Sequence, residues 1–223
     1  MLKTAILCTV QLGAAGLLVA AELTIPVDTA NPQWTISPRL VGMHQVYGWV
    51  PDSIYSDGGI AAWARRAGIS TSRFPGGTVV KYWDWEHPSG QLWTDNYAPG
   101  FNPANNVAAS QWMSLDEYLA FVVASGIHPH FGVNMGSGAS PGDNASWPLI
   151  SESACIARAV RMVTYVKNKG YGGAWWYLGN EQAHWHGGTV GYAQVCKRYA
   201  QAMKAVDPAI KLFWNANGAT AAW

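Results

Sequence analysis

The sequence predicts an α/β protein built as a (β/α)8 TIM barrel, of which the chain covers about the first five strand–helix units. Three observations predict this fold class. Short apolar segments alternate strictly with amphipathic helical segments, which is typical of a parallel sheet covered by helices. Long segments follow the strands, whereas the connections from a helix back to the next strand are only a few residues long. Several of the strands also end in polar residues, as strands do at the catalytic mouth of a barrel.

A glycine separates the first strand–helix unit from the second. Residues 39–43 are expected to form the first strand, and residues 59–67 a helix that Gly68 closes. A second strand follows directly over residues 69–74 and ends in a Pro-Gly-Gly turn. Residues 76–113 are then a long connection on the side where the strands end.

The sequence indicates where the next helix starts. Ser114 and Glu117 have the spacing of a capping box, which opens a helix that stops at Gly126. Residues 127–134 are expected to form the third strand. Residues 136–150, rich in glycine, serine and proline, are expected to form a long loop.

The last two units repeat the same order. A helical pattern is closed by Gly170, residues 174–178 form an aromatic fourth strand, and a second helical pattern stops at Pro208 before a fifth strand at residues 210–214. A closed barrel needs eight strands and typically about 250 residues. We therefore expect residues 22–223 to be the N-terminal portion of a longer catalytic domain. A doubly wound open sheet is the alternative, but no glycine-rich phosphate turn opens any of these helices.

The first 21 residues have the pattern of a secretory signal peptide. Lys3 precedes a short apolar stretch that ends in small residues before Glu22, and a membrane anchor is the alternative. The chain has 14 Lys and Arg against 13 Asp and Glu. This balance gives no electrostatic reason to bind nucleic acid or an acidic membrane. We expect a secreted, extracellular protein with neither a nucleic-acid nor a membrane partner.

Secretion affects how the cysteines and one asparagine are interpreted. Cys155 and Cys196 fall on successive predicted helices, so they are expected either to form one disulfide or to be two buried thiols. Asn144 begins an Asn-Ala-Ser triplet in a loop and is a candidate glycosylation site.

Polar side chains gather where the predicted strands end. The aromatic fourth strand runs into Asn180 and Glu181, and a carboxyl group next to aromatic residues is typical of a catalytic acid. Amides both donate and accept hydrogen bonds, so they match neutral ligands rich in hydroxyl groups, such as sugars. A glycosidase needs two carboxylates at the bond that it cleaves, and Glu181 supplies one of them. The residues at the strand ends are His44, Gln45, Arg73, Asn134, Asn180, Glu181, Asn215 and Asn217.

Aromatic residues in the loops are further candidates for ligand contact. His184 and Trp185, in the loop after Glu181, are expected to contact the sugar. His184 and His186 are two residues apart, a spacing that suits neither a helical nor a carboxylate-completed zinc site, so we expect no metal and no cofactor. Sugar stacking and loop packing both stay open for the tryptophans of the long second loop, Trp83, Trp85 and Trp93.

Several of these segments resemble a known group of enzymes. Gly179-Asn180-Glu181 resembles the Asn-Glu acid/base motif of a large clan of retaining glycoside hydrolases with (β/α)8 barrels. Arg73-Phe74-Pro75-Gly76-Gly77, with Tyr82 and Trp83 behind it, is similar to the second-strand motif of α-L-arabinofuranosidases of glycoside hydrolase family 51. The other segments similar to that family are residues 133–138, 165–168, 199–200 and 206–212. The resemblance covers most of residues 38–217 and keeps the order of the motifs.

The resemblance implies a role for each matching residue. Glu181 would be the general acid/base, and Asn180 a hydrogen-bond partner of the sugar 2-hydroxyl. Arg73 would lie near the nucleophilic carboxylate and keep it ionised. The alternative role for Arg73 is a structural salt bridge, and the alternative role for Asn134 is to close a turn. In such enzymes the nucleophile is a second glutamate on the seventh strand. This sequence ends before that strand, so the fragment alone is expected to be inactive.

Two positions depart from the family and leave the sugar specificity open. Thr78 stands where the family usually has Asn, and His44-Gln45 where it usually has Glu. We expect a secreted retaining glycoside hydrolase that acts on plant-type polysaccharide or oligosaccharide and is arabinofuranosidase-like. β-Xylosidase-like and endo-acting enzymes of the same clan are alternatives. A non-catalytic carbohydrate-binding protein is the competing hypothesis, because the second carboxylate is missing.

Overall fold

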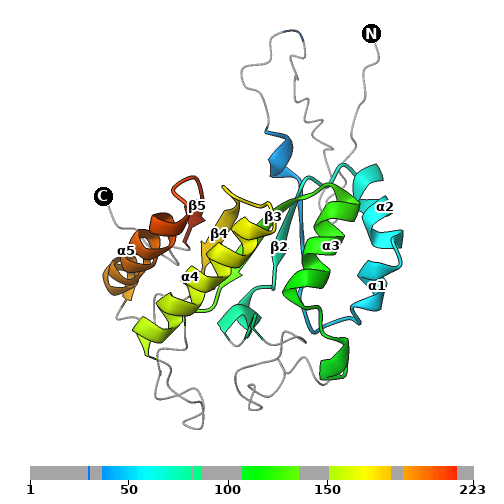
Figure 1. Ribbon diagram of the computed structural model, residues 1–223. Helices are drawn as coiled ribbons and strands as arrows, with labels where there is room; N and C mark the ends of the chain where they lie inside the picture. Colours follow the sequence, from blue (N-terminus) through cyan, green and yellow to red (C-terminus); the bar gives the residue numbers. More distant parts are fainter. Residues whose placement is uncertain are drawn as a thin grey trace, which may run out of the picture. The chain divides into compact units, whose positions relative to one another are not determined.

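The computed structural model describes Ala30 and residues 37–81, 83–86, 107–135, 151–181 and 188–214. In this part of the chain, parallel strands and intervening helices follow one another from the N-terminus to the C-terminus (Figure 1). The elements are η1 (Pro38–Leu40), β1 (Gly42–His44), α1 (Ser53–Ser56), α2 (Gly59–Arg66), β2 (Thr71–Phe74), η2 (Thr78–Lys81), η4 (Ala109–Gln111), α3 (Leu115–Ser125), β3 (His128–Val133), α4 (Glu152–Asn168), β4 (Trp175–Leu178), α5 (Gly188–Val206) and β5 (Lys211–Phe213), where η marks a 3-10 helix.

The order of the strands excludes the doubly wound alternative. The sheet has five strands in the order β1-β2-β3-β4-β5, and each neighbouring pair is parallel. A doubly wound sheet reverses its strand order at a switch point, and this sheet has no reversal. The predicted alternation of strand and helix is confirmed. Consecutive βα units in sequence order are the repeating unit of a (β/α)8 barrel.

One face of the sheet packs against the helices. Tyr118 of α3 stacks on Phe74 of β2 with the ring centroids 4.2 Å apart, and its hydroxyl donates to the carbonyl oxygen of Ser72 at 2.9 Å. Phe131 of β3 meets the same tyrosine edge-on, and Trp176 of β4 lies 4.9 Å further along. These rings are buried. In Figure 1, α3 and α4 lie in front of the strands that they cover.

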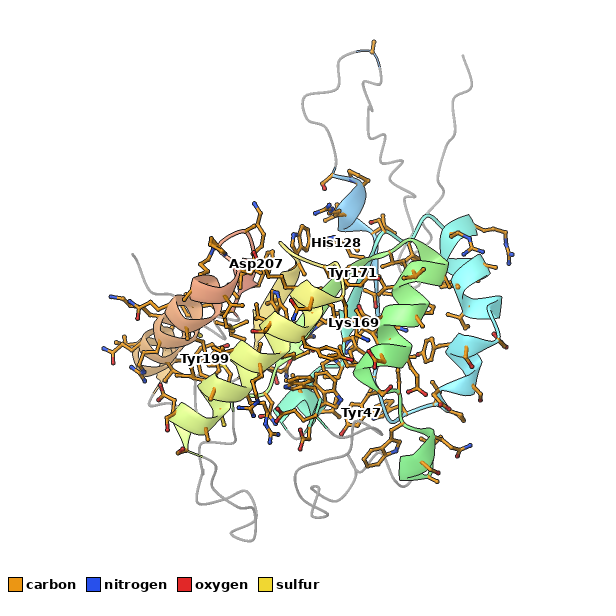
Figure 2. All side chains as sticks on the ribbon, viewed as in Figure 1. Tyr47, His128, Lys169, Tyr171, Tyr199 and Asp207 are labelled. Atoms are coloured by element: carbon orange, nitrogen blue, oxygen red, sulfur yellow. The ribbon has the colours of Figure 1, made fainter. Side chains whose placement is uncertain are left out.

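The other face of the sheet, which corresponds to the inside of a barrel, carries polar and aromatic side chains. His44, Arg73, His130 and Trp175 are register neighbours across β1 to β4. All four are half-buried or exposed although they lie in strands. His128, which begins β3, and Tyr47, which follows β1, lie at opposite ends of the sheet (Figure 2). The end near Tyr47 is where the strands finish.

The start of the chain differs from its prediction. The first strand begins at Gly42 instead of residue 39, because residues 38–40 form the 3-10 helix η1; the Ser70 hydroxyl lies within hydrogen-bond distance of the carbonyl oxygens of Pro38 and Val41 at its two ends. The short helix α1 was not predicted. Its cap is Asp52, whose Oδ1 accepts from the Ser53 backbone N–H at 2.8 Å.

The capping box of α3 is confirmed. Ser114 Oγ accepts from the Glu117 backbone N–H at 3.3 Å, and Glu117 Oε2 accepts from the Ser114 backbone N–H at 2.6 Å. The helix ends at Gly126, which has a φ of 71°. The predicted signal peptide lies outside the described residues. None of the helices described is long and apolar enough to cross a membrane.

Candidate active site

The two motifs that carry the family resemblance meet at the carboxyl ends of β2 and β4. Arg73 Nη2 donates a hydrogen bond of 2.7 Å to Asn180 Oδ1, across 107 residues of sequence. Asn180 is only 7% exposed, and a buried amide needs a partner of this kind. Since its oxygen accepts from the guanidinium, its Nδ2 is the group left to donate to a ligand.

Arg73 is held on a second side by Tyr177 of β4. The guanidinium carbon lies 4.3 Å from the centre of the tyrosine ring, which is the geometry of a cation–π contact. Among the described residues, Arg73 makes no ion pair; its contacts are an amide and an aromatic face. The salt-bridge alternative is therefore not what this part of the chain shows.

Glu181 projects away from the end of β4. It is exposed, and its φ of 52° is in the left-handed region, two residues after Gly179 with a φ of 65°. These two left-handed residues turn the backbone off the strand, so the carboxyl group is not enclosed by the aromatic residues that precede it. A non-glycine residue in this conformation costs about 1–2 kcal/mol, and such strain concentrates at functional sites.

The turn after β2 lies between β1 and β4. A Cβ built on Gly77 would lie 3.6 Å from Asn180 Oδ1 and 3.6 Å from His44 Cε1, so the backbone of Gly77 separates the two side chains. Loss of water around its ring, and then the charge of Arg73, lower the pKa of His44 below its ordinary value. A neutral His44 at this point can donate or accept a hydrogen bond from a hydroxyl group.

Gln45 does not join these residues. It is 1% exposed, and its Oε1 accepts from the hydroxyl of Ser72, whose own side chain is buried. The strand alternation places Gln45 and His44 on opposite sides of the backbone. Of His44 and Gln45, only His44 faces the site.

Asn134, which follows β3, holds the chain that comes after β2. It is 7% exposed, and its Nδ2 donates to the carbonyl oxygen of Trp83 at 3.1 Å. Trp83 is 1% exposed and packs edge-on against Phe74 at 5.2 Å, so it belongs to the core. Trp85 lies 5.5 Å from Tyr165 of α4. Both tryptophans therefore pack the loop in this structure.

Two carboxylates in the same segment are already paired. Asp84 lies 2.8 Å from Arg158, and Glu86 lies 3.1 Å from Arg158 and 2.6 Å from Arg161, both arginines being on α4. Asp84 is 3% exposed. These ion pairs hold the segment after η2 against α4.

The two helical cysteines are thiols, so the disulfide alternative is not what the structure has. Cys155 and Cys196 are both buried, and burial raises the pKa of each to about 11. The hydroxyl of Tyr192, which lies four residues before Cys196 on α5, donates to the carbonyl oxygen of Leu178.

Several predicted residues lie outside the described part of the chain. They are the loop residues His184 and Trp185, the glycosylation candidate Asn144, the strand-end residues Asn215 and Asn217, and Trp93. The side chain of Thr78 is also outside it. Tyr177 is the residue of the site that sequence reasoning missed.

The chain is similar to several solved structures whose descriptions name glycoside hydrolases. One is an arabinofuranosidase, with a TM-score of 0.52 and 19% identity, over 80% of this chain and 40% of that chain. A second is an α-L-arabinofuranosidase from Thermotoga maritima, with a TM-score of 0.47 and 23% identity, over 70% of this chain and 33% of that chain. A third is a family 39 glycoside hydrolase from Bacteroides cellulosilyticus WH2, with a TM-score of 0.45 and 18% identity, over 82% of this chain and 33% of that chain. No protein-family model matches the chain, and no curated protein matches it in sequence.

The comparison with the first arabinofuranosidase establishes the fold. This chain spans 40% of that protein's length. Its five parallel strands in sequence order, with helices between them, have the fold of part of that protein, and the predicted α/β fold class is confirmed.

Proposed function

We propose that this chain belongs to a retaining glycoside hydrolase that acts on plant-type polysaccharide or its oligosaccharides, with arabinofuranosidase-like specificity. The observation that carries the proposal is the 2.7 Å hydrogen bond between Arg73 and Asn180. It joins the two strand-end motifs beside Glu181, on a fold that is similar to that of an arabinofuranosidase. Secretion is part of the proposal and rests on the pattern of residues 1–21.

In this proposal Glu181 acts first as the general acid and then as the general base. It protonates the oxygen of the leaving sugar and then, as a carboxylate, takes a proton from the water that completes hydrolysis. Its exposed position beyond the end of β4 leaves room for a sugar chain. Asn180 donates from Nδ2 to a sugar hydroxyl. Arg73 stabilises the second carboxylate that a retaining mechanism requires about 5–5.5 Å from the acid/base.

The test is hydrolysis by the protein expressed from its full open reading frame. We expect turnover of aryl α-L-arabinofuranosides or β-xylosides, and NMR of the first product should show retained anomeric configuration. An inverted product would contradict the retaining assignment. Binding of oligosaccharides without turnover of any of these substrates would replace the proposal with a non-catalytic carbohydrate-binding protein.

A further inference from the structure

Tyr177 lies across the inner face of the sheet because Gly132 has no side chain. The two residues are register partners on β4 and β3. A Cβ built on Gly132 would lie 2.4 Å from both Cζ and the hydroxyl oxygen of Tyr177, closer than real side chains approach. The glycine therefore provides the space through which the tyrosine reaches past β3.

The hydroxyl of Tyr177 reaches the turn that follows β2. It donates to the carbonyl oxygen of Gly76 and accepts from the Gly76 backbone N–H at 3.3 Å, 101 residues away in sequence. Gly76 has a φ of 139°, a conformation open to glycine and rarely to other residues. The Tyr177 hydroxyl therefore forms hydrogen bonds with both the backbone carbonyl oxygen and the backbone N–H of Gly76, which lies outside the sheet.

The ring of Tyr177 supports Arg73 at the same time. The guanidinium lies over the ring at 4.3 Å and donates from there to Asn180 at 2.7 Å. Tyr177 is 3% exposed, and burial raises its pKa, so the hydroxyl stays protonated and can donate. Ring and hydroxyl thus hold two different parts of the site.

We propose that Tyr177 is a positioning residue of the candidate active site: it fixes the Arg73 guanidinium and the Gly76-Gly77 turn relative to Asn180. The catalytic consequence rests on the proposed function. Because Gly77 lies against both Asn180 and His44, a shift of the turn reaches both side chains. Tyr177 itself acts through these residues and not on the sugar.

The test compares Tyr177→Phe with Tyr118→Phe in the full-length protein. Tyr177→Phe keeps the ring under Arg73 and removes only the bonds to Gly76. Tyr118→Phe removes a matched buried bond, from a hydroxyl to the carbonyl oxygen of Ser72 at 2.9 Å, on the helix side of β2. Both variants are expected to unfold at similar, slightly lower denaturant concentrations. Tyr177→Leu, which also removes the ring, serves as the more severe variant.

Two readouts separate positioning from stability. Only Tyr177→Phe should lower kcat/KM, by roughly ten- to hundredfold, since small misplacements of a site have effects of that size. Only Tyr177→Phe should also move the His44 Cε1–H resonance, because His44 lies against the turn. Wild-type kcat/KM in Tyr177→Phe would overturn the proposal, and so would an unmoved His44 resonance. If the wild-type protein hydrolyses no glycoside, the proposed function fails, and the His44 resonance alone decides whether Tyr177 positions the turn.

Discussion

The guanidinium of Arg73 and the amide of Asn180 are joined by a 2.7 Å hydrogen bond although β3 lies between their strands. The arginine side chain spans the width of a strand and rests on the ring of Tyr177 as it does so. The planar guanidinium can stack and donate at once. Arg73 therefore links the end of β2 to the end of β4, next to Glu181.

Replacing this arginine by lysine should impair activity while leaving the charge in place. An ammonium group on a flexible chain cannot stack on Tyr177 and donate to Asn180 in one fixed geometry. We expect Arg73→Lys to lower kcat/KM about tenfold or more. Arg161→Lys is the control, because Arg161 is an exposed arginine on α4 that pairs with Glu86 and makes no contact with Asn180 or Tyr177 among the described residues. Equal kcat/KM in the two variants would argue against a role for Arg73 in the site.

Asn134 should matter for stability as well as for any contact with sugar. Asn134→Ala leaves the carbonyl oxygen of Trp83 without this donor, which costs about 1–3 kcal/mol of unfolding free energy. Asn168→Ala, at the exposed end of α4, is the matched control, and it should change the free energy of unfolding by less than about 0.5 kcal/mol. Urea unfolding measures both. If Asn134→Ala instead raised KM and left the stability unchanged, Asn134 would be a sugar-binding residue and its bond to Trp83 would not stabilise the loop.

The protein should lose stability in mild acid because of His130. Burial, and then the charge of Arg73, lower the pKa of His130 to about 4, and its buried Nε2 has no hydrogen-bond partner among the residues that the structure describes. Between about pH 6.5 and 4 the unfolded chain binds a proton that the folded one does not, so unfolding free energy falls as the pH falls. The loss is about 3 kcal/mol at most.

His130→Gln tests this directly by removing the titrating group. Urea unfolding at pH 7.5, 5.5 and 4.5 should show a smaller loss of stability in the variant than in the wild type. His44 and His128 have pKa values lowered in the same direction, so some loss should remain. An identical pH dependence in both proteins would mean that His130 does not stay neutral in the fold.

The cysteines should behave as buried thiols. With a pKa of about 11, Cys155 and Cys196 stay protonated at neutral pH and react slowly with alkylating agents. Peptide mass spectrometry of the non-reduced protein should find both unmodified after native alkylation and both alkylated after alkylation in urea. A peptide pair linked through these two residues would show instead that a disulfide forms.

Local signals account for the parts of the fold that were predictable. The capping box at Ser114 and Glu117 and the closing Gly126 lie within a few residues of each other, so they specify α3 without tertiary information. Helix α1 has only four residues, too few for a periodic pattern to show. The Ser70 hydroxyl lies against the turn before β1 from far along the chain, and no local pattern contains this contact.

The site was predictable as a set of residues but not as an arrangement. Motif resemblance identified Arg73, Asn180 and Glu181, whereas the bond between the first two depends on the register of three strands. Tyr177 was missed because a run of apolar residues does not reveal which side chain crosses the sheet. Gly132, in the middle of a strand, was the available signal, since such a glycine often marks a close approach. Whether two cysteines bond depends on the directions of their side chains, which spacing does not give.

Glu181→Gln in the full-length protein tests the central claim most directly. The account predicts that the variant folds normally, hydrolyses unactivated oligosaccharides at least about a hundredfold more slowly, and keeps much of its first-step rate on aryl glycosides whose leaving group needs no protonation. Glu152→Gln, which removes a carboxylate paired at the surface with Arg198, should retain wild-type rates. Near-normal hydrolysis of unactivated substrate by Glu181→Gln would contradict the assignment of Glu181 as the general acid/base.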